Sequence, residues 1–236
     1  MTLPQGMRHP ACRAWLPLLL ALAAQASAQD TGPSPDPYQC PDAEVTVRAA
    51  HPADAADACL GAYDAVSFFL RLGLVAPGEP LRIEIVPEIP IDEGRTAVGC
   101  YLERDRRILM LPYAEFAGHE TWFGLPVERA MYRSLATHET AHALADCHFG
   151  IPDPTLQAKE YVAYVTMFAT MEPGLRTRVL RAIPGEGFAS EYRISEVFYL
   201  CDPMRFGAEA YRHYLKAGHS DAFLRAVLAG RALVDW

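Results

Sequence analysis

SLATHETAHAL, the stretch at residues 134–144, contains the pattern HExxH. On a helix, His138 and His142 lie four residues apart and point the same way, so their imidazole nitrogens can converge on one ion. Glu139, next to His138, reaches the same space from the side. This arrangement suits a zinc ion and a water molecule that a carboxylate deprotonates. The stretch therefore predicts a zinc site built on one helix.

The residues around the motif indicate that this helix is mostly buried. Between residues 130 and 147 the only formal charges are Arg133, Glu139 and Asp146. A buried polar group without a partner costs on the order of 1 to 3 kcal/mol, and an unpaired charge costs more. A metal ion supplies that partner. The alternative is a helix without metal, in which the two histidines are neutral core residues and Glu139 pairs with an arginine.

The N-terminal residues 1–28 have the pattern of a cleavable secretory signal. Arg8 and Arg13 precede an apolar run at residues 15–24, and Ala26-Ser27-Ala28 is typical of a cleavage site. The apolar run is too short to cross a membrane, and no later segment is long enough. We therefore expect cleavage after Ala28 and a periplasmic or secreted product without a transmembrane segment. The proline-rich residues 29–42 are expected to form an extended leader.

The charge of the chain argues against a nucleic-acid partner. The formal net charge is −8, and residues 1–28 hold two arginines and no acidic residue, so the exported product is more acidic still. A nucleic-acid backbone requires basic patches on the protein that binds it. We therefore expect no nucleic-acid ligand.

The cysteines indicate disulfide bonds, because an exported protein matures in an oxidising compartment. Two pairs and one odd thiol are expected among Cys40, Cys59, Cys100, Cys147 and Cys201. The sequence leaves the pairing open, although Cys147 and Cys201 could cross-link the HExxH helix to the C-terminal helices. No C-x-x-C spacing occurs, which disfavours a thiol-ligated zinc site or a redox motif.

Periodicity and turn residues place a mixed region before the motif and helices after it. The expected elements before the motif are a short strand near Val45, a helix from an N-cap at Asp54 to Gly73, a strand at 81–85 and a hairpin of 98–103 with 107–111. The HExxH helix is expected to begin near Pro126. The helices expected after it span 153–171, with an N-cap at Asp153, then 174–182, 191–200, 206–215 and 220–228.

This order of elements, together with the motif, resembles a zincin metallopeptidase. The residues that surround the motif in zincins are uncharged, and those here comply: Ala136, Thr140, Ala141, Ala143 and Leu144. The resemblance implies an α+β fold with a small twisted sheet, a backing helix and the HExxH helix at residues 43–150, and a mostly helical subdomain at 151–236. It also implies zinc as cofactor, a peptide or protein substrate, and Glu139 as the general base. A bacterial family of exported HExxH proteins without known function is similar as well.

Two residues compete for the third protein ligand of the zinc ion. Glu160 lies on the apolar face of the next helix, where a carboxylate needs a cation, and this resembles the gluzincin pattern. His148 has the spacing of the metzincin signature HExxHxxGxxH, but Ala145 occupies the position where that signature has glycine for a sharp turn. The sequence favours Glu160 and keeps His148 as the alternative.

The sequence indicates less clearly which residues orient the metal ligands or donate a hydrogen bond to the transition state. Thermolysin-like enzymes have an acidic residue one turn after the glutamate ligand, but this chain has Tyr164 there, and Asp146 is the candidate replacement. Gluzincins also supply a histidine or tyrosine that donates to the transition state. The candidates for that donor lie in the C-terminal helices: Tyr192, Tyr199, Tyr211 and His213.

Two functions follow as expectations. The first is an exported zinc peptidase in which the hairpin before the HExxH helix aligns an extended peptide by main-chain hydrogen bonds. The alternative is a non-catalytic zincin-like domain with a structural or vestigial zinc that binds an envelope or secreted partner. An open coordination position in a cleft would favour the first, and a fourth protein ligand would favour the second.

Overall fold

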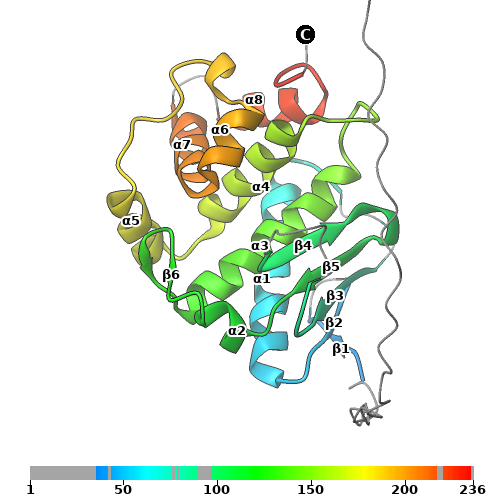
Figure 1. Cartoon of the computed structure of the whole chain (residues 1–236). Helices are drawn as coiled ribbons and strands as arrows, with labels where there is room; N and C mark the ends of the chain where they lie inside the picture. The colour runs from blue at the N-terminus through cyan, green and yellow to red at the C-terminus, as the bar shows by residue number, and fades with distance from the viewer. Residues whose placement is uncertain are drawn as a thin grey trace, which may run out of the picture. The chain divides into compact units, whose positions relative to one another are not determined.

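The computed structural model describes residues 36–41, 44–75, 78, 80–89, 97–216 and 220–234. The expected signal at 1–28 and most of the expected leader at 29–42 lie outside the described residues. Within the described chain the fold is α+β, with a mixed sheet and eight α-helices (Figure 1). None of the helices in the described ranges is long and apolar enough to cross a membrane.

A five-stranded sheet occupies the N-terminal half of the described chain. Its strands lie in the order β1 (Tyr38–Gln39), β2 (Val45–Arg48), β3 (Leu81–Ile85), β5 (Arg107–Met110) and β4 (Gly99–Leu102). β2, β3 and β5 are parallel, whereas β1 and β4 run antiparallel to their neighbours at the two edges. Val45, Val47, Leu81 and Ile83 are buried and alternate with less buried residues, which confirms the expected one-faced strands.

Apart from one short helix after the hairpin, which was not predicted, the helices follow the order expected from the sequence. They are α1 (Pro52–Arg71), α2 (Tyr113–Ala117), α3 (Arg129–Asp146), α4 (Leu156–Thr170), α5 (Pro173–Ala182), α6 (Glu196–Cys201), α7 (Pro203–Leu215) and α8 (Ser220–Leu228). Figure 1 shows α1 and α3 against the same side of the sheet, with α4, α6 and α7 on the far side of α3 from the strands. The hairpin of β4 and β5 is confirmed, and a short 3₁₀ turn, η1 (Glu103–Asp105), joins the strands.

Several expected helix boundaries are wrong for identifiable reasons. α3 begins at Arg129 because residues 121–126 form a separate two-stranded hairpin, β6 (Thr121–Trp122) and β7 (Leu125–Pro126). The N-cap of α4 is Thr155, whose hydroxyl accepts from the Ala158 amide, so Asp153 lies outside the helix. The expected helix at 191–200 is interrupted: a 3₁₀ turn, η2 (Glu191–Arg193), precedes α6.

Asp54 does not cap α1, which begins at Pro52 with His51 in the N-cap position. Its buried carboxylate instead accepts from the Tyr113 amide at 3.1 Å and pairs with the Arg129 guanidinium at 2.8 Å. Arg129 also pairs with Asp57 and lies over the Tyr113 ring. One acidic residue of α1 thereby fixes the starts of both α2 and α3.

The disulfide expectation is only partly correct. Cys40 and Cys59 are bonded, which ties the strand region to α1. Among the described residues, Cys100, Cys147 and Cys201 are free thiols, so a second bridge between Cys147 and Cys201 is wrong. Tyr199 of α6 lines a cavity together with His138 of α3, and Cys147, the C-cap of α3, lies nine positions after His138, about 14 Å by the helix rise. Disulfide geometry requires Cα atoms within about 7 Å.

Close packing of α1 on α3 determines where the HExxH helix sits. A Cβ atom added to Gly61 of α1 would lie 2.4 Å from the Arg133 carbonyl oxygen and 2.6 Å from the Ala136 Cβ of α3. The neighbouring positions on α1 are small and buried: Ala58, Ala62 and Ala65. The two helix backbones therefore approach more closely than larger side chains would allow.

Gly61→Ala should lower the free energy of unfolding by about 1 to 3 kcal/mol, because the added methyl group forces α1 and α3 apart. An ordinary glycine-to-alanine change inside a helix instead stabilises by roughly 1 kcal/mol. Urea unfolding followed by circular dichroism measures the difference. Gly78→Ala is the control, since a methyl group there would meet nothing within 4 Å. A Gly61→Ala protein as stable as the wild type would contradict the close contact.

Candidate metal centre and cleft

The packing of α4 against α3 brings together two histidines and a glutamate. Nε2 of His138 and Nε2 of His142 are 3.1 Å apart. Glu160 of α4 lies opposite them, with its Oε2 3.5 Å from Nε2 of His138 and its Oε1 3.6 Å from Nε2 of His142. One possible ligand atom from each residue lies within 4.8 Å of the others. The structure thus brings together the three predicted ligands from two helices.

This group is nearly closed off from solvent, so its charges interact strongly. Burial alone would raise the pKa of Glu160, but His142, His138 and the hydroxyl of Tyr199 together hold it below its usual range. Burial lowers the pKa of His142 to about 4, with the charges of His138 and Lys159 acting in the same direction. At neutral pH, His142 is a neutral imidazole beside an ionised carboxylate.

The donor set fits a divalent metal ion. Two imidazoles and one carboxylate are the ligands of many catalytic zinc sites, which leave one position open. Oε2 of Glu160 and Nδ1 of His138 are buried without a hydrogen-bond partner. Separations of 3.5 and 3.6 Å are long for hydrogen bonds. A shared cation would satisfy the carboxylate, and among the residues that the structure describes this is the group that could hold one.

The side chain of Glu139 extends from α3 to the edge strand β4. Its carboxylate accepts a hydrogen bond from the Tyr101 amide, and burial is the main reason why its pKa rises to about 7. The strand comes this close because Gly99 has no side chain: a Cβ atom there would lie 2.7 Å from Oε1 of Glu139. A glycine inside a predicted strand indicates that another part of the chain can approach the strand backbone closely. Gly99 carries this signal, but the sequence prediction did not include Gly99 among the site residues. A carboxyl group with a pKa near neutrality can both accept and release a proton.

A cavity of about 330 Å³ opens beside His138 and Glu139. Its wall combines apolar, aromatic and polar side chains, and the residues come from the β4 approach, α2, the β6 hairpin, α3, α4 and the α6–α7 junction. The side chains that define it include Val98, Phe116, His119, Trp122, Leu135, Tyr164, Tyr199 and Met204. The motif predicts only His138 and Glu139 of this wall, because the other residues come from separate elements that the fold brings together.

Two tyrosines support the centre in different ways. Tyr164 packs its ring on His138 with centroids 4.5 Å apart, and a Cβ atom on Gly207 of α7 would lie 2.4 Å from that ring. Tyr199 of α6 lines the cavity, and its hydroxyl bonds the Glu160 carboxylate. Tyr164 therefore orients a predicted ligand by packing, and Tyr199 brings a hydroxyl group to the centre.

Comparison with known proteins assigns the chain to a family. The model of a family of unknown function, DUF6639, matches residues 45–236. The chain belongs to the DUF6639 family. No curated protein and no solved structure matches it. The matched residues include the whole candidate metal centre and the cleft of this DUF6639 protein.

The structure separates the other predicted site residues of this DUF6639 protein from the centre. His148 turns away at the end of α3, where its Nε2 lies 2.8 Å from the Val75 carbonyl oxygen, so it is not the third ligand. Asp146 is exposed and accepts from the Tyr101 hydroxyl at 3.0 Å instead of orienting a zinc histidine. Asp146 is the last residue of α3 and His148 follows it, so both lie beyond the part of the helix that carries the candidate ligands.

The remaining donor candidates lie elsewhere in the fold. His213 is fully buried in α7, with Nδ1 2.8 Å from the Tyr161 hydroxyl, and is a core residue. Tyr192 is 84% exposed and lines a different cavity. Tyr211 is buried and stacks on Phe168. Of the tyrosines and histidine expected in this role, Tyr199 is the one that the structure places at the centre.

Glu160→Gln should weaken zinc binding by an order of magnitude or more, because it removes the anionic ligand while keeping the shape of the side chain. Competition against a chromophoric chelator measures the affinity. His148→Ala is the matched control and should bind zinc as the wild type does, since His148 contacts the Val75 carbonyl group. Equal affinities of Glu160→Gln and wild type would remove Glu160 from the centre.

Proposed function

We propose that this DUF6639 protein is an exported zinc-dependent peptidase with a zincin-like, gluzincin-type site. One observation carries the proposal: the three ligand atoms of His138, His142 and Glu160 converge, and Glu139 lies beside them on the wall of a cavity. A metal with an adjacent general base and a cleft for substrate is the arrangement required for hydrolysis of an amide bond.

The metal would be held by Nε2 of His138, Nε2 of His142 and the carboxylate of Glu160. When bound, zinc supplies a Lewis acid that polarises a carbonyl group and makes a water molecule acidic near neutral pH. Tyr164 keeps the His138 ring in place by packing on it. The low pKa of His142 keeps its imidazole neutral and available as a ligand.

Glu139 moves the proton in this proposal. Its carboxylate takes a proton from the attacking water and gives it to the nitrogen of the leaving amine. The Tyr101 amide fixes the orientation of the carboxylate, and burial keeps its pKa near neutrality, which suits both transfers. Tyr199, whose hydroxyl lies beside Glu160 on the cavity wall, is in place to donate a hydrogen bond to the substrate carbonyl oxygen as negative charge develops there.

The edge strand β4 provides a means of holding a peptide. β4 pairs with β5 on one side and ends the sheet order on the other, and Val98 and Gly99 line the cavity. An extended peptide can add to such an edge by main-chain hydrogen bonds, with its side chains directed alternately into the cavity and away from it. A polypeptide substrate explains why the strand approaches Glu139 so closely.

The shape of the centre favours catalysis over a structural metal. Structural zinc sites are closed by four protein ligands, whereas catalytic sites keep an open position. Among the described residues the cluster contains three ligating side chains, and His148, the candidate fourth, bonds a backbone carbonyl group elsewhere. The cavity reaches two members of the site, His138 and Glu139.

Export is supported by the disulfide between Cys40 and Cys59, because such bonds persist in oxidising compartments. The basic and apolar pattern of residues 1–28 is consistent with delivery to the periplasm or the exterior.

Glu139→Gln should keep the zinc content of the wild type and lose peptide hydrolysis by a factor of about 100 or more, because the amide cannot accept the proton from water. A digest of a broad peptide library, with mass spectrometry of the products and metal analysis of the same samples, measures both. Glu115→Gln, an exposed carboxylate on α2, is the control. Undiminished hydrolysis by Glu139→Gln would overturn the role of Glu139.

Tyr199→Phe should lower kcat by about 10 to 100-fold with little change in zinc content, because it removes a hydroxyl group that acts in the transition state. Steady-state kinetics on one cleaved peptide separate kcat from KM. Tyr63→Phe, which removes the hydroxyl group of an exposed tyrosine on α1 outside both cavities, is the matched control. A Tyr199→Phe protein with unchanged kcat would leave Tyr199 as a wall residue only.

A further inference from the structure

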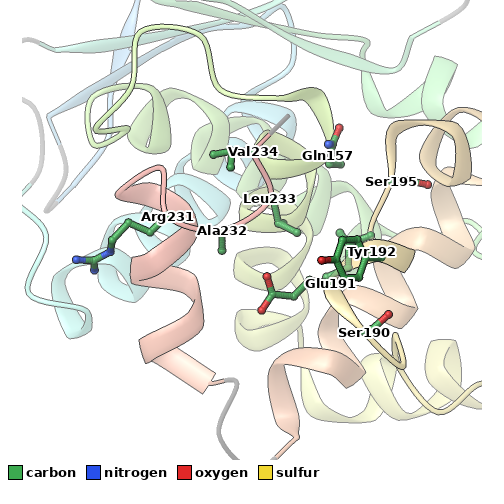
Figure 2. A pocket seen from close by; sticks show the side chains of 10 residues that line it. Gln157, Ser190, Glu191, Tyr192, Ser195, Arg231, Ala232, Leu233 and Val234 are labelled. Carbon is green, nitrogen blue, oxygen red and sulfur yellow. The ribbon is translucent and has the colours of Figure 1, made fainter. Parts of the chain in front are cut away.

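A second cavity, of about 560 Å³, lies apart from the metal centre. Figure 2 shows its two sides: the turn after α8 with Ala232 and Leu233, and the η2 segment with Glu191 and Tyr192, with Gln157 of α4 between them. The floor is apolar, since Ile194, Ala232 and Leu233 are buried. The rim is polar and carries Ser190, Glu191, Ser195 and Arg231. The metal centre uses none of these residues.

The floor of this cavity includes a strained residue. Leu233 has a φ of 56°, in the left-handed region that a leucine rarely adopts. The Thr155 hydroxyl holds it there by donating to the Leu233 carbonyl oxygen at 2.7 Å. Residues in such conformations persist only where the surrounding structure imposes them, and they concentrate at ligand-binding positions. The strain places the Leu233 side chain in the cavity wall.

The short helix α6 connects this cavity to the metal cleft. Ser195, the N-cap of α6, lines the larger cavity, and Tyr199 of the same helix lines the cleft. Four residues of helix rise by about 6 Å. The outer surface beside α6 is apolar as well, since Val197 is 71% and Leu200 51% exposed. An extended peptide advances by about 3.3 Å per residue, so two or more residues cover the rise of α6 from Ser195 to Tyr199.

We propose that the larger cavity is a second substrate site, which binds an apolar side chain of the same polypeptide whose scissile bond lies in the metal cleft. The proposal rests on the peptidase function above. The buried floor of Ile194, Ala232 and Leu233 takes the side chain, and the polar rim faces the peptide main chain. The site therefore selects long, extended polypeptides with two apolar residues at a defined spacing.

The test uses binding, which does not require hydrolysis. Zinc-loaded Glu139→Gln protein is titrated with fluorescent decapeptides of glycine and serine that carry one fixed phenylalanine and one leucine placed two to seven residues from it. The peptide with the preferred spacing should bind about tenfold more tightly than the peptide with phenylalanine alone. Burying a leucine side chain contributes at least that factor in affinity.

Two substitutions test whether the gain in affinity arises from the larger cavity. Leu233→Gly removes a floor side chain, and glycine suits the positive φ at this position. Tyr192→Ser removes an exposed ring from the wall. Together they should abolish the tenfold gain at the preferred spacing. Leu215→Ser, which removes an exposed apolar side chain outside both cavities, should keep it.

The outcomes separate this proposal from the peptidase assignment. A gain that survives in the Leu233→Gly, Tyr192→Ser protein, or the absence of a gain at every spacing, overturns the second substrate site. Failure of the zinc-loaded wild type to cleave any of the same peptides overturns the peptidase function. In that case the spacing-dependent binding still decides whether the cavity takes an apolar side chain of a polypeptide.

Discussion

The buried carboxylate of Glu160 is the constraint on which the centre depends. A charge removed from water is stable only beside a compensating partner, and here the partners are two imidazoles 3.5 and 3.6 Å away. Two histidines cannot fully satisfy a carboxylate while they also lie 3.1 Å from each other. A divalent cation resolves the conflict, because it attracts all three groups at once. The helix pair α3 and α4 is therefore packed around a position that suits a metal.

That packing depends in turn on small residues at the neighbouring contacts. Gly61 lets α1 lie directly against α3, and Gly99 lets the edge strand β4 meet the Glu139 carboxylate. On the other side, Gly207 lets α7 press on the ring of Tyr164, which packs on His138. At all three positions a methyl group would fall within 3 Å of another atom. The closely approaching backbones therefore position the site, together with the hydrogen bond from Tyr199 to the Glu160 carboxylate.

The sequence predicts the parts of this structure that depend on local pattern. Alternation identified the strands at Val45 and Leu81, and helical spacing with an unexplained carboxylate identified Glu160. Prediction from the sequence failed where contacts between distant residues determine the structure. Asp54 resembles an N-cap but pairs with Arg129, and Cys147 and Cys201 are both free thiols in the described structure. Tyr199 could not be distinguished from Tyr192, because only the break between η2 and α6 determines which one faces the centre.

The segment from η2 to α6 contributes residues to the walls of both cavities. It contains six residues of helix, none of them fully buried, yet it carries a residue of each cavity wall. An element with so little buried surface has little stability of its own, since helices of this length are held by tertiary contacts. Substrate bound in both cavities would bury the apolar side chains beside α6 and hold Tyr199 against Glu160. In the proposed peptidase, binding energy from contacts away from the scissile bond would then position the Tyr199 hydroxyl group, and remote contacts of this kind raise kcat as well as affinity.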